Sequence, residues 1–269
     1  MPELPEVETA CRGIAPAIVG RRITGWVLRQ PRLRWPVELP ESLRGQAIVR
    51  VFRRAKYLVL ATEAGAVIVH LGMSGSLRVV RIGTPAGRHD HVDLEFDDEL
   101  ALRLNDPRRF GSVHFQQGDW RAHWLLKDLG IEPLTPAFDG AYLQRAARGR
   151  RVAVKQMLMD AHVVVGVGNI YANEALFRAG IRPRLAAGRV SRTRYDALAS
   201  AVREILDAAI RDGGTTLRDF VDSSGRPGYF ARSLKVYGRA GERCYDCNTA
   251  LKGLRTGQRA TVYCPNCQQ

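Results

Sequence analysis

The sequence opens with Met1-Pro2-Glu3-Leu4-Pro5-Glu6. Proline suits the first turn of a helix and glutamates suit its positive end, so this stretch predicts a helix start. Apolar residues then recur at helical spacing as far as Gly20: Val7, Cys11, Ile14 and Ile18. We therefore expect an amphipathic helix that packs on the domain that follows, with Cys11 buried on its apolar face.

The same stretch offers a second interpretation, which is chemical. If Met1 is removed, the secondary amine of Pro2 becomes the chain terminus. An α-amino group has a pKa of about 7.7–8.0, so a fraction of it is unprotonated and nucleophilic at neutral pH. Glu3 beside it can give or take a proton. An amine next to an acid suits a Schiff base with an aldehyde-level carbon, whereas the alternative is that these residues serve only the helix.

The charge balance points to a polyanionic partner. The 269 residues include 41 Lys+Arg and 27 Asp+Glu, which gives a net charge of +14. Nucleic acid is favoured over an acidic membrane surface, because no basic amphipathic helix or lipidation signal is present. A hydrophobic content of 45% is ordinary for a globular protein, and no apolar run is long enough to span a bilayer. No secretion signal opens the chain, so we expect a cytoplasmic protein.

The middle of the chain divides into a strand-rich part and a helical part. Short runs with a period of two predict an antiparallel sandwich or barrel: 23–29, 48–61, 66–71, 76–80, 91–96, 101–104 and 112–115. A connection at 130–136 contains two prolines and predicts a domain boundary. Helical patterns follow it: 140–147, 152–159, 170–179 and 191–210, the last with Ser191 as its cap.

The final part of the chain carries two pairs of cysteines. Cys244-x-x-Cys247 and Cys264-x-x-Cys267 are separated by sixteen residues. This is the spacing of a four-thiolate structural zinc site, with iron or a redox pair as the alternatives. Arg255 and Arg259 lie on the expected hairpin between the pairs, where they either touch phosphate or remain solvated.

Two predicted turns combine cations with large apolar residues. One runs over 70–75 and places Met73 at its tip, and the other runs over 105–111 and presents Arg108 and Phe110. An apolar wedge beside an arginine is suited to entering a base stack. The alternative is that Met73 and Phe110 are core residues.

Further polar positions suggest contacts with an anion. His89 lies in a segment that resembles a metal half-site, but we favour a phosphate contact or a strand-start histidine. Lys56 is expected in a strand on the same face as Arg54, in a charged groove or at a solvated edge. Asn169 follows two glycines and is expected to cap a helix whose amides form an anion seat. Lys155 and the basic run 148–151 add positive charge.

Together, these residues resemble the formamidopyrimidine-DNA glycosylase family, bacterial enzymes that remove oxidised purines from DNA. The matching segments cover nearly the whole chain: 2–9, 70–77, 106–111, 164–172, 213–220, 227–230 and the four cysteines. Leu4 favours this family over the endonuclease VIII branch, which opens with Pro-Glu-Gly-Pro-Glu and prefers oxidised pyrimidines. Arg218 departs from the lysine that relatives often carry, and it keeps the charge.

The resemblance implies an α+β multidomain fold. A catalytic β-sandwich domain with the N-terminal helix would occupy residues 1–132, a helix-two-turns-helix DNA-binding domain residues 133–234, and a β-hairpin zinc finger residues 235–269. It also implies one structural Zn²⁺ ion. The implied partner is double-stranded DNA with oxidised bases or abasic sites, bound between the lobes by a monomeric, nucleoid-associated enzyme.

The resemblance further implies a role for individual residues. Pro2 would be the Schiff-base nucleophile and Glu3 the proton donor, while Lys56 would assist β-elimination and Arg259 δ-elimination. The implied DNA contacts are His89, Arg150, Asn169 and a void-filling triad of Met73, Arg108 and Phe110. The segment 222–229 resembles a loop over the extruded base. Two rival functions are a zinc-ribbon protein that binds damaged DNA without cutting it and an RNA-processing factor.

Overall fold

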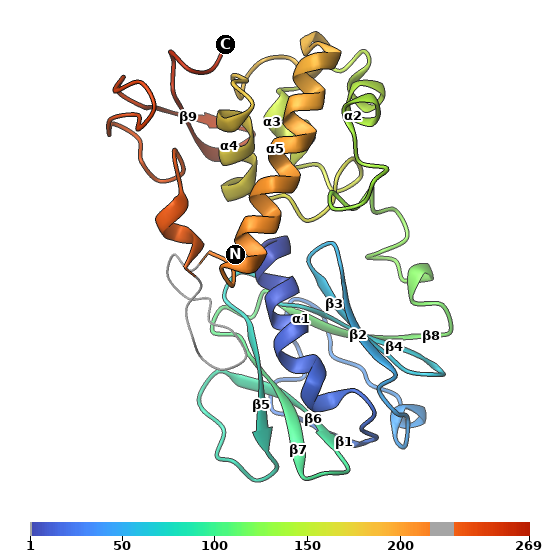
Figure 1. The fold of residues 1–269 in the computed structure, drawn as a ribbon. Coiled ribbons are helices and arrows are strands. Elements are labelled where there is room, and N and C mark those ends of the chain that lie inside the picture. Colours follow the sequence, from blue (N-terminus) through green and yellow to red (C-terminus); the bar gives the residue numbers. More distant parts are fainter. Residues whose placement is uncertain (1, 216–228) are drawn as a thin grey trace. The chain divides into compact units, whose positions relative to one another are not determined.

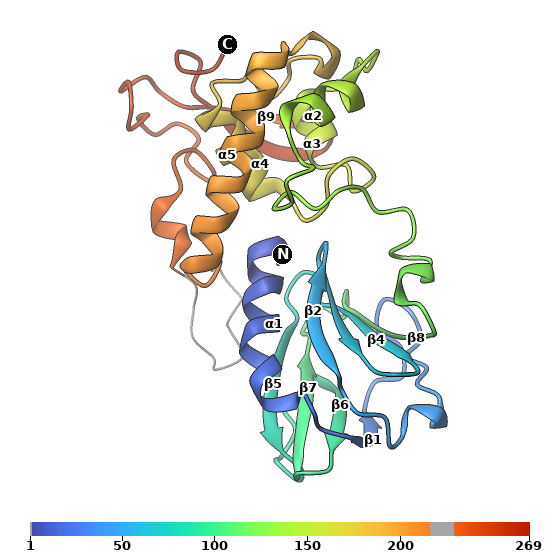
Figure 2. The ribbon, with the colours of Figure 1, turned by 45° about the vertical axis from the view of Figure 1, so that its right-hand side comes forward.

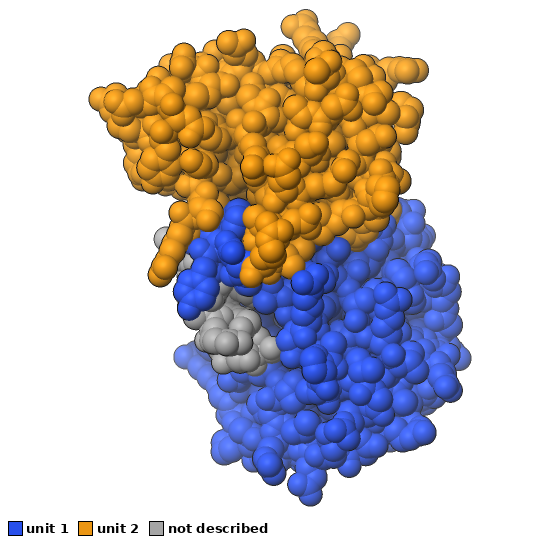
Figure 3. All heavy atoms as spheres, viewed as in Figure 1, with its two compact units in different colours: residues 1–128, 212–231 blue, residues 129–211, 232–269 orange. Residues whose placement is uncertain are grey.

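The structure is a computed structural model that describes residues 2–215 and 229–269. The chain forms two compact units (Figure 3). The first unit comprises Met1–Asp128 with Asp212–Ala231, and the second comprises Leu129–Arg211 with Arg232–Gln269. Because these units do not coincide with the three predicted domains, the three-part division stays a prediction.

Among its described residues, the first unit consists of one α-helix and two four-stranded antiparallel sheets, whose strands the period-two pattern predicts. The sheets have the strand orders β1-β6-β7-β5 and β2-β3-β4-β8. Their bounds are β1 (Ile23–Leu28), β2 (Arg50–Arg54), β3 (Tyr57–Ala61), β4 (Gly65–His70), β5 (Ser76–Arg81), β6 (Asp90–Phe96), β7 (Leu100–Asn105) and β8 (Ser112–Gln117), with short 3₁₀ turns η1 (Glu41–Leu43) and η2 (Trp120–Ala122). The expected sandwich is confirmed.

Helix α1 (Leu4–Ile18) packs on β2, β3 and β5 (Figures 1 and 2). Its apolar face joins the core of the sandwich through four residues that are at most 4% exposed: Val7, Cys11, Ile14 and Ile18. These are the positions that the helical spacing predicts. Burial raises the pKa of the Cys11 thiol to about 12, so this cysteine stays protonated and acts as an apolar side chain.

One strand prediction is wrong. The run expected over 48–61 is a hairpin in which a two-residue turn, Ala55 and Lys56, joins β2 to β3. Ala55 has a φ of 55°, in the left-handed region that usually selects glycine or asparagine. Because neither residue type is present, the sequence does not reveal the turn. Lys56 therefore lies at a hairpin tip and not within a strand.

A buried ion pair network fastens the loop between β5 and β6. The guanidinium of Arg103 is 2% exposed and donates to both carboxylate oxygens of Asp93, at 2.8 and 2.7 Å. It also donates to the carbonyl oxygens of Thr84 and Pro85, at 2.9 and 3.1 Å. Removing one partner of such a buried pair lowers the free energy of unfolding by about 3–5 kcal/mol. The network therefore fixes the loop that leads to His89.

The second unit consists of helices and a C-terminal hairpin. Its elements are α2 (Gly140–Ala147), α3 (Val154–Leu158), α4 (Asn169–Arg178), η3 (Ala187–Arg189), α5 (Arg192–Arg211), β9 (Lys252–Thr256) and β10 (Arg259–Tyr263). The turn η4 (Phe230–Ser233) contains the position in the sequence where the first unit ends and the second resumes. Helices α2 and α4 pack on α5 (Figure 1). Helix α4 also packs on β10. Ser191 caps α5 as predicted, because its hydroxyl accepts from the Arg194 amide at 3.4 Å. Within residues 2–215 and 229–269, no helix has the length and apolar character that crossing a bilayer requires.

An aromatic cluster beside β8 surrounds one histidine. The ring of His114 lies 5.1 Å from His123, 5.7 Å from Trp35 and 5.9 Å from Trp124. Burial, together with the nearby His123, lowers the pKa of His114 from 6.5 to about 4. The unfolded chain therefore binds more protons than the folded chain between these two values.

We expect the melting temperature to fall as the pH is lowered from about 6.5 to about 4, because His114 must then protonate on unfolding. Replacing the histidine by glutamine (His114→Gln) should make this fall shallower. Thermal unfolding measured across the interval tests the prediction, with the exposed His162→Gln as the control. Identical pH profiles for wild type and His114→Gln would contradict it.

Candidate functional site

The start of the chain is buried and fixed in the first unit. Pro2 is buried and Glu3 is 2% exposed, and Glu3 is the N-cap of α1. Glu3 and Glu6 form a capping box, in which Glu6 Oε2 accepts from the Glu3 amide at 2.7 Å. The predicted nucleophile and the predicted acid are thus neighbours at the positive end of a helix.

Glu6 also holds a distant segment of the same unit. Its carboxylate is 1% exposed, and Oε1 accepts from the Thr215 amide at 2.7 Å. Gly214 has a φ of +87°, and a Cβ there would lie 3.0 Å from Glu6 Oε1. A glycine at this position lets the backbone approach the carboxylate. The helix-dipole role expected for Glu6 is therefore incomplete, because Glu6 joins the N-terminus to the segment that precedes residue 216.

Lys56 lies close to a neutral histidine. Tyr57 pairs with His70 across β3 and β4, and their rings are 4.9 Å apart. Burial, together with the charges of Lys56 and Arg34, lowers the pKa of His70 to about 4. Its Nδ1 accepts from the Gly72 amide at 3.0 Å. This corner of the first unit therefore holds two cations beside an uncharged imidazole, which suits an anion.

The two predicted turns interlock. Gly72 has a φ of +64°, and a Cβ there would lie 2.4 Å from the Gly111 nitrogen and 2.5 Å from the Phe110 carbonyl carbon. Phe110 is 47% exposed, and the Arg108 guanidinium carbon lies 5.1 Å from its ring centroid. Met73 is half-buried. The alternative that Phe110 is a core residue is therefore wrong.

His89 is half-buried, and its ring centroid lies 6.4 Å from that of His91. His91 is occupied by a hydrogen bond between its Nε2 and the Asp106 carbonyl oxygen, at 2.9 Å. Among residues 2–215 and 229–269, the four cysteines form the only group of three or more potential ligands. The role of His89, as a phosphate contact or a strand-start histidine, stays a prediction.

In the second unit, Asn169 is the first residue of α4 and its N-cap is Gly168. The expectation that the Asn169 side chain caps the helix is wrong, because the chain enters the helix one residue earlier. Asn169 is held from the next turn by Asn173, whose Nδ2 donates to the Asn169 carbonyl oxygen at 2.6 Å. Asn173 Oδ1 accepts from the Val262 amide at 2.9 Å, which ties α4 to β10.

The predicted contact Arg150 is half-buried and forms an ion pair with Asp160 at 3.3 Å. Arg259 is exposed and begins β10, directly after the turn of the hairpin. Arg259 is thus accessible to solvent, while the charge of Arg150 is shared with a carboxylate.

Lys155 is buried under the hairpin strand β10 and donates hydrogen bonds to it. It is 0% exposed, and its Nζ donates to Thr261 Oγ1 at 2.7 Å and to the Ala260 carbonyl oxygen at 3.0 Å. Thr261 Oγ1 in turn donates to the Arg259 carbonyl oxygen at 3.2 Å. Lys155 therefore adds its positive charge inside the fold, where its ammonium group fixes the strand that carries Arg259.

The link into the cysteine-rich tail is fixed by a buried carboxylate. Glu174 of α4 is 4% exposed and accepts from the amides of Lys235, Val236 and Tyr237, at 2.8, 3.0 and 2.8 Å. Burial raises the pKa of Glu174, although the three donors act in the opposite direction. The tail is thus anchored to the helix that also carries Asn169.

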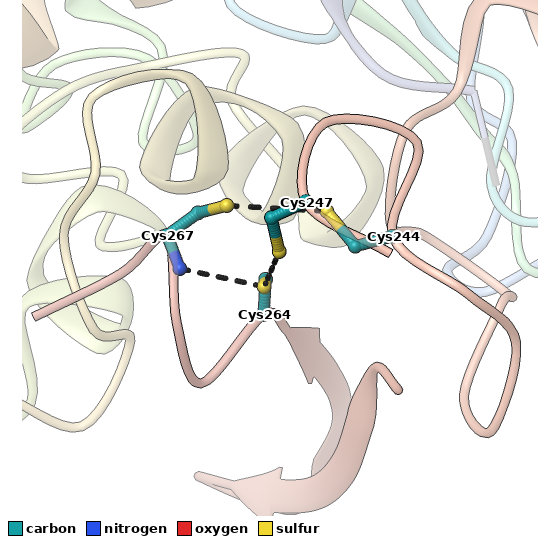
Figure 4. Close-up of side chains that lie close together, drawn as sticks. All are labelled: Cys244, Cys247, Cys264 and Cys267. Carbon is teal, nitrogen blue, oxygen red and sulfur yellow. Dashed lines mark hydrogen bonds between the residues drawn. The ribbon is translucent and has the colours of Figure 1, made fainter. Parts of the chain in front are cut away.

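The four tail cysteines converge on one point (Figure 4). One pair lies in a turn before β9 and the other lies in a turn directly after β10. All four sulfurs lie within 4.8 Å of one another, with Sγ–Sγ distances of 3.4 Å for Cys247–Cys264 and 4.0 Å for Cys244–Cys267. These distances exceed a disulfide bond of about 2.05 Å.

The arrangement fits a tetrahedral metal ion. Four thiolates at the usual Zn–S distance of about 2.3 Å stand about 3.8 Å apart, which lies between the two distances observed. Burial and the neighbouring cysteines raise the pKa of Cys267, and a dication among the sulfurs would reverse this effect. Four protein ligands leave no open position, so the centre suits a structural role.

Comparison with known proteins assigns the chain to a family. The model of the formamidopyrimidine-DNA glycosylase N-terminal domain matches residues 1–113, and that of the H2TH domain of the same enzymes matches residues 129–221. The chain belongs to the formamidopyrimidine-DNA glycosylase family. The resemblance drawn from the sequence motifs is thus confirmed, and the chain is a DNA glycosylase with abasic-site lyase activity.

Relatives of this glycosylase match along its whole length. The formamidopyrimidine-DNA glycosylases of Alkalilimnicola ehrlichii and Pseudomonas aeruginosa are 58% and 57% identical to it, with all of both chains covered. A Lactococcus lactis enzyme mutant in complex with Fapy-dG-containing DNA has a TM-score of 0.91 and 32% identity over all of both chains. The Thermus thermophilus enzyme has a TM-score of 0.89 and 36% identity, covering 99% of this chain and 98% of its own.

The roles assigned to single residues of the glycosylase stay predictions. Pro2, Glu3, Lys56, His89 and the interlocked turns lie in the first unit, whereas Arg150, Asn169, Arg259 and the four cysteines lie in the second. Most of segment 222–229, the predicted loop over the base, lies outside the described residues. The sequence did not reveal that Glu6, Asp106, Lys155 and Glu174 act as buried anchors, since each binds groups far along the chain. A charged residue at a position otherwise read as buried is the signal that could have found them.

Replacing Cys247 by serine should abolish metal binding and lower the melting temperature of the glycosylase, because structural zinc supplies folding free energy. Elemental analysis of the purified protein should give one zinc ion per chain for the wild type and none for Cys247→Ser. Cys11→Ala serves as a matched control and should keep its metal, because Cys11 lies in the first unit. A metal-free wild type would contradict the prediction.

Proposed function

We propose that this chain excises oxidised purines, including formamidopyrimidines and 8-oxoguanine, from double-stranded DNA and then cuts the abasic strand by β,δ-elimination. The observation that carries the proposal is the buried Pro2–Glu3 pair at the N-terminus of α1, held by the capping box with Glu6. The Fapy-dG and abasic-site complexes of the Lactococcus lactis enzyme support this substrate class. The buried Leu4 favours it over oxidised pyrimidines.

The nitrogen of Pro2, once Met1 is removed, attacks C1′ of the deoxyribose. The bond between C1′ and the base breaks, and the base leaves with its electron pair and accepts a proton from Glu3 or through it. The C1′–O4′ bond then breaks, O4′ takes up a proton and the Pro2 nitrogen loses its own, which leaves an iminium between Pro2 and the opened sugar. This iminium withdraws electrons from C2′, so loss of a C2′ proton expels the 3′ phosphate. The positive end of the α1 dipole disfavours a protonated amine and so favours the attack.

Two further residues serve the eliminations in this proposal. Lys56, at the β2–β3 turn beside His70, assists the first elimination, and Arg259, exposed on the hairpin, assists the second. Both also hold phosphates, together with His89, Arg150 and Asn169. Met73, Arg108 and Phe110 fill the space that the damaged nucleotide leaves, which offsets the cost of extrusion, a few kcal/mol.

The proposed setting is a monomer that acts on the bacterial nucleoid in the cytoplasm. A net charge of +14 supports binding through phosphates, so affinity should fall steeply with salt. The cysteine centre holds one structural Zn²⁺ ion. We keep the three-part division, with a catalytic domain at 1–132, a helix-two-turns-helix domain at 133–234 and a zinc finger at 235–269, as part of the proposal.

Borohydride should trap a covalent complex between the wild-type chain and a duplex with one abasic site, because it reduces the imine on Pro2. A variant with glycine inserted between Met1 and Pro2 replaces the proline terminus and should lose trapping and strand cleavage. Intact-mass analysis confirms which terminus each protein carries. Normal trapping by the extended chain would overturn the proposal, whereas a chain that binds the lesion duplex without trapping would be a non-catalytic binder.

Glu3→Gln should slow base excision by at least about 100-fold, since a positioned acid contributes that much to proton transfer. The measurement is single-turnover release of 8-oxoguanine from a duplex. Glu8→Gln is the matched control, because Glu8 lies on the next turn of α1 and pairs with Arg12 and Arg53. Full activity of Glu3→Gln would remove Glu3 from the mechanism.

A further inference from the structure

The interlocked turns of the first unit meet at one carboxylate that has no role in the proposed chemistry. Asp106 follows β7, and its side chain is 0% exposed. Its Oδ1 accepts from the Ser74 hydroxyl at 3.1 Å, and its Oδ2 accepts from the Gly111 amide at 2.7 Å. The two oxygens therefore bind two loops, one that carries Met73 and one that carries Arg108 and Phe110.

The backbone of the same residue reaches a third segment. The Asp106 amide donates to the His89 carbonyl oxygen at 2.9 Å. Its own carbonyl oxygen lies 2.9 Å from His91 Nε2 and accepts from the Arg109 amide at 3.2 Å. One buried residue thus contacts the three segments that carry His89, Met73 and the pair Arg108 and Phe110.

The loop that Asp106 closes has two energetically unfavourable features. Arg109 has a φ of 55°, in the left-handed region that side chains disfavour. Phe110 exposes 47% of its surface to water, although burial would be favourable for an aromatic ring. Two unfavourable features persist in one loop only if the surrounding contacts impose them.

Gly72 and Gly111 have no side chains, so the backbones of the two loops can lie in direct contact. A Cβ on Gly72 would lie 2.4 Å from the Gly111 nitrogen, and one on Gly111 would lie 2.7 Å from the His70 carbonyl oxygen and 3.0 Å from Asp106 Oδ2. The carboxylate bridges this contact from one side. Without it, the Gly111 amide and the Ser74 hydroxyl would lose their acceptor in a buried place.

We propose that Asp106 is a positioning residue that holds the loops of Met73, Arg108 and Phe110 in the shape that enters the base stack before DNA binds. The inference rests on the proposed function of that triad. If the three side chains are already ordered in the free protein, the entropic cost of ordering them is not added to the free energy of base extrusion. The loss of Asp106 should therefore affect the release of a damaged base and spare the eliminations at a sugar that carries no base.

Asp106→Ala should slow single-turnover excision of 8-oxoguanine by about tenfold or more, the factor expected for a lost buried hydrogen bond. Cleavage and borohydride trapping at a preformed abasic site should stay within about threefold of the wild type. Asp106→Asn keeps an acceptor for the Gly111 amide and a donor for the Ser74 hydroxyl, so it should restore most of the excision rate. The proposal would be overturned if Asp106→Ala slowed excision and abasic-site cleavage equally, or if it slowed neither reaction.

Ser74→Ala removes one of the two carboxylate contacts and should slow excision selectively, which decides the question if Asp106→Ala does not fold. Ile68→Val is the control for stability alone, because Ile68 is 0% exposed in β4. It should lower stability slightly without changing the ratio of the two rates. In a Phe110→Ala background, Asp106→Ala should add little, whereas additive effects would contradict an action through the wedge.

Hydrogen exchange in the free protein provides a test that does not depend on activity. Asp106→Ala should accelerate amide exchange in residues 72–75 as well as in 106–111, while Ile68→Val should not. Protection that stays unchanged in 72–75 would overturn the proposed link between the loops. A wild-type chain that forms no imine would instead contradict the proposed function, and the exchange result would still decide whether Asp106 couples the loops.

Discussion

The carboxylate of Glu6 is the contact on which the start of the chain depends. It is buried, and it accepts from the amides of Glu3 and Thr215. Each hydrogen bond to such a charged group contributes about 1.5–3 kcal/mol, whereas an unsupported chain end frays. A nucleophile at a frayed end would have to be ordered in every reaction cycle. Burying one carboxylate therefore fixes the chain end that carries the nucleophile in the proposed function.

The same solution recurs in both units. Asp106 connects three loops, Lys155 supports the strand of Arg259, and Glu174 accepts from three successive amides at the entrance to the cysteine-rich tail. In each case a buried polar group is satisfied mainly by the backbone or hydroxyl of another segment, which is a loop for Asp106 and Glu174 and strand β10 for Lys155. The sheets and helices thus hold the loops that face DNA in the proposed function, and the charged groups inside the fold decide where those loops lie.

The helices and strands followed from periodicity, and the metal centre followed from cysteine spacing, because both signals are local. The turn at Ala55 and Lys56 was missed because it lacks glycine or asparagine, and the cap of α4 was placed one residue late. The buried anchors were missed for a different reason. Glu6 and Thr215 are 209 positions apart, and Asp106 and Ser74 are 32 apart, so no short motif marks either pair. Such contacts become visible only when the chain is folded.

The backbone contact between Gly72 and Gly111 has a consequence for how relatives of this protein diverge. A methyl group on Gly72 would collide with the main chain of the other loop, and rotating a side chain could not relieve the collision. Neither loop can therefore take a larger residue at the contact or change its backbone conformation while the other loop keeps its own. Viable lineages should exchange the two segments as a pair, and a chimera that inherits them from different parents should carry a defect that neither parent has.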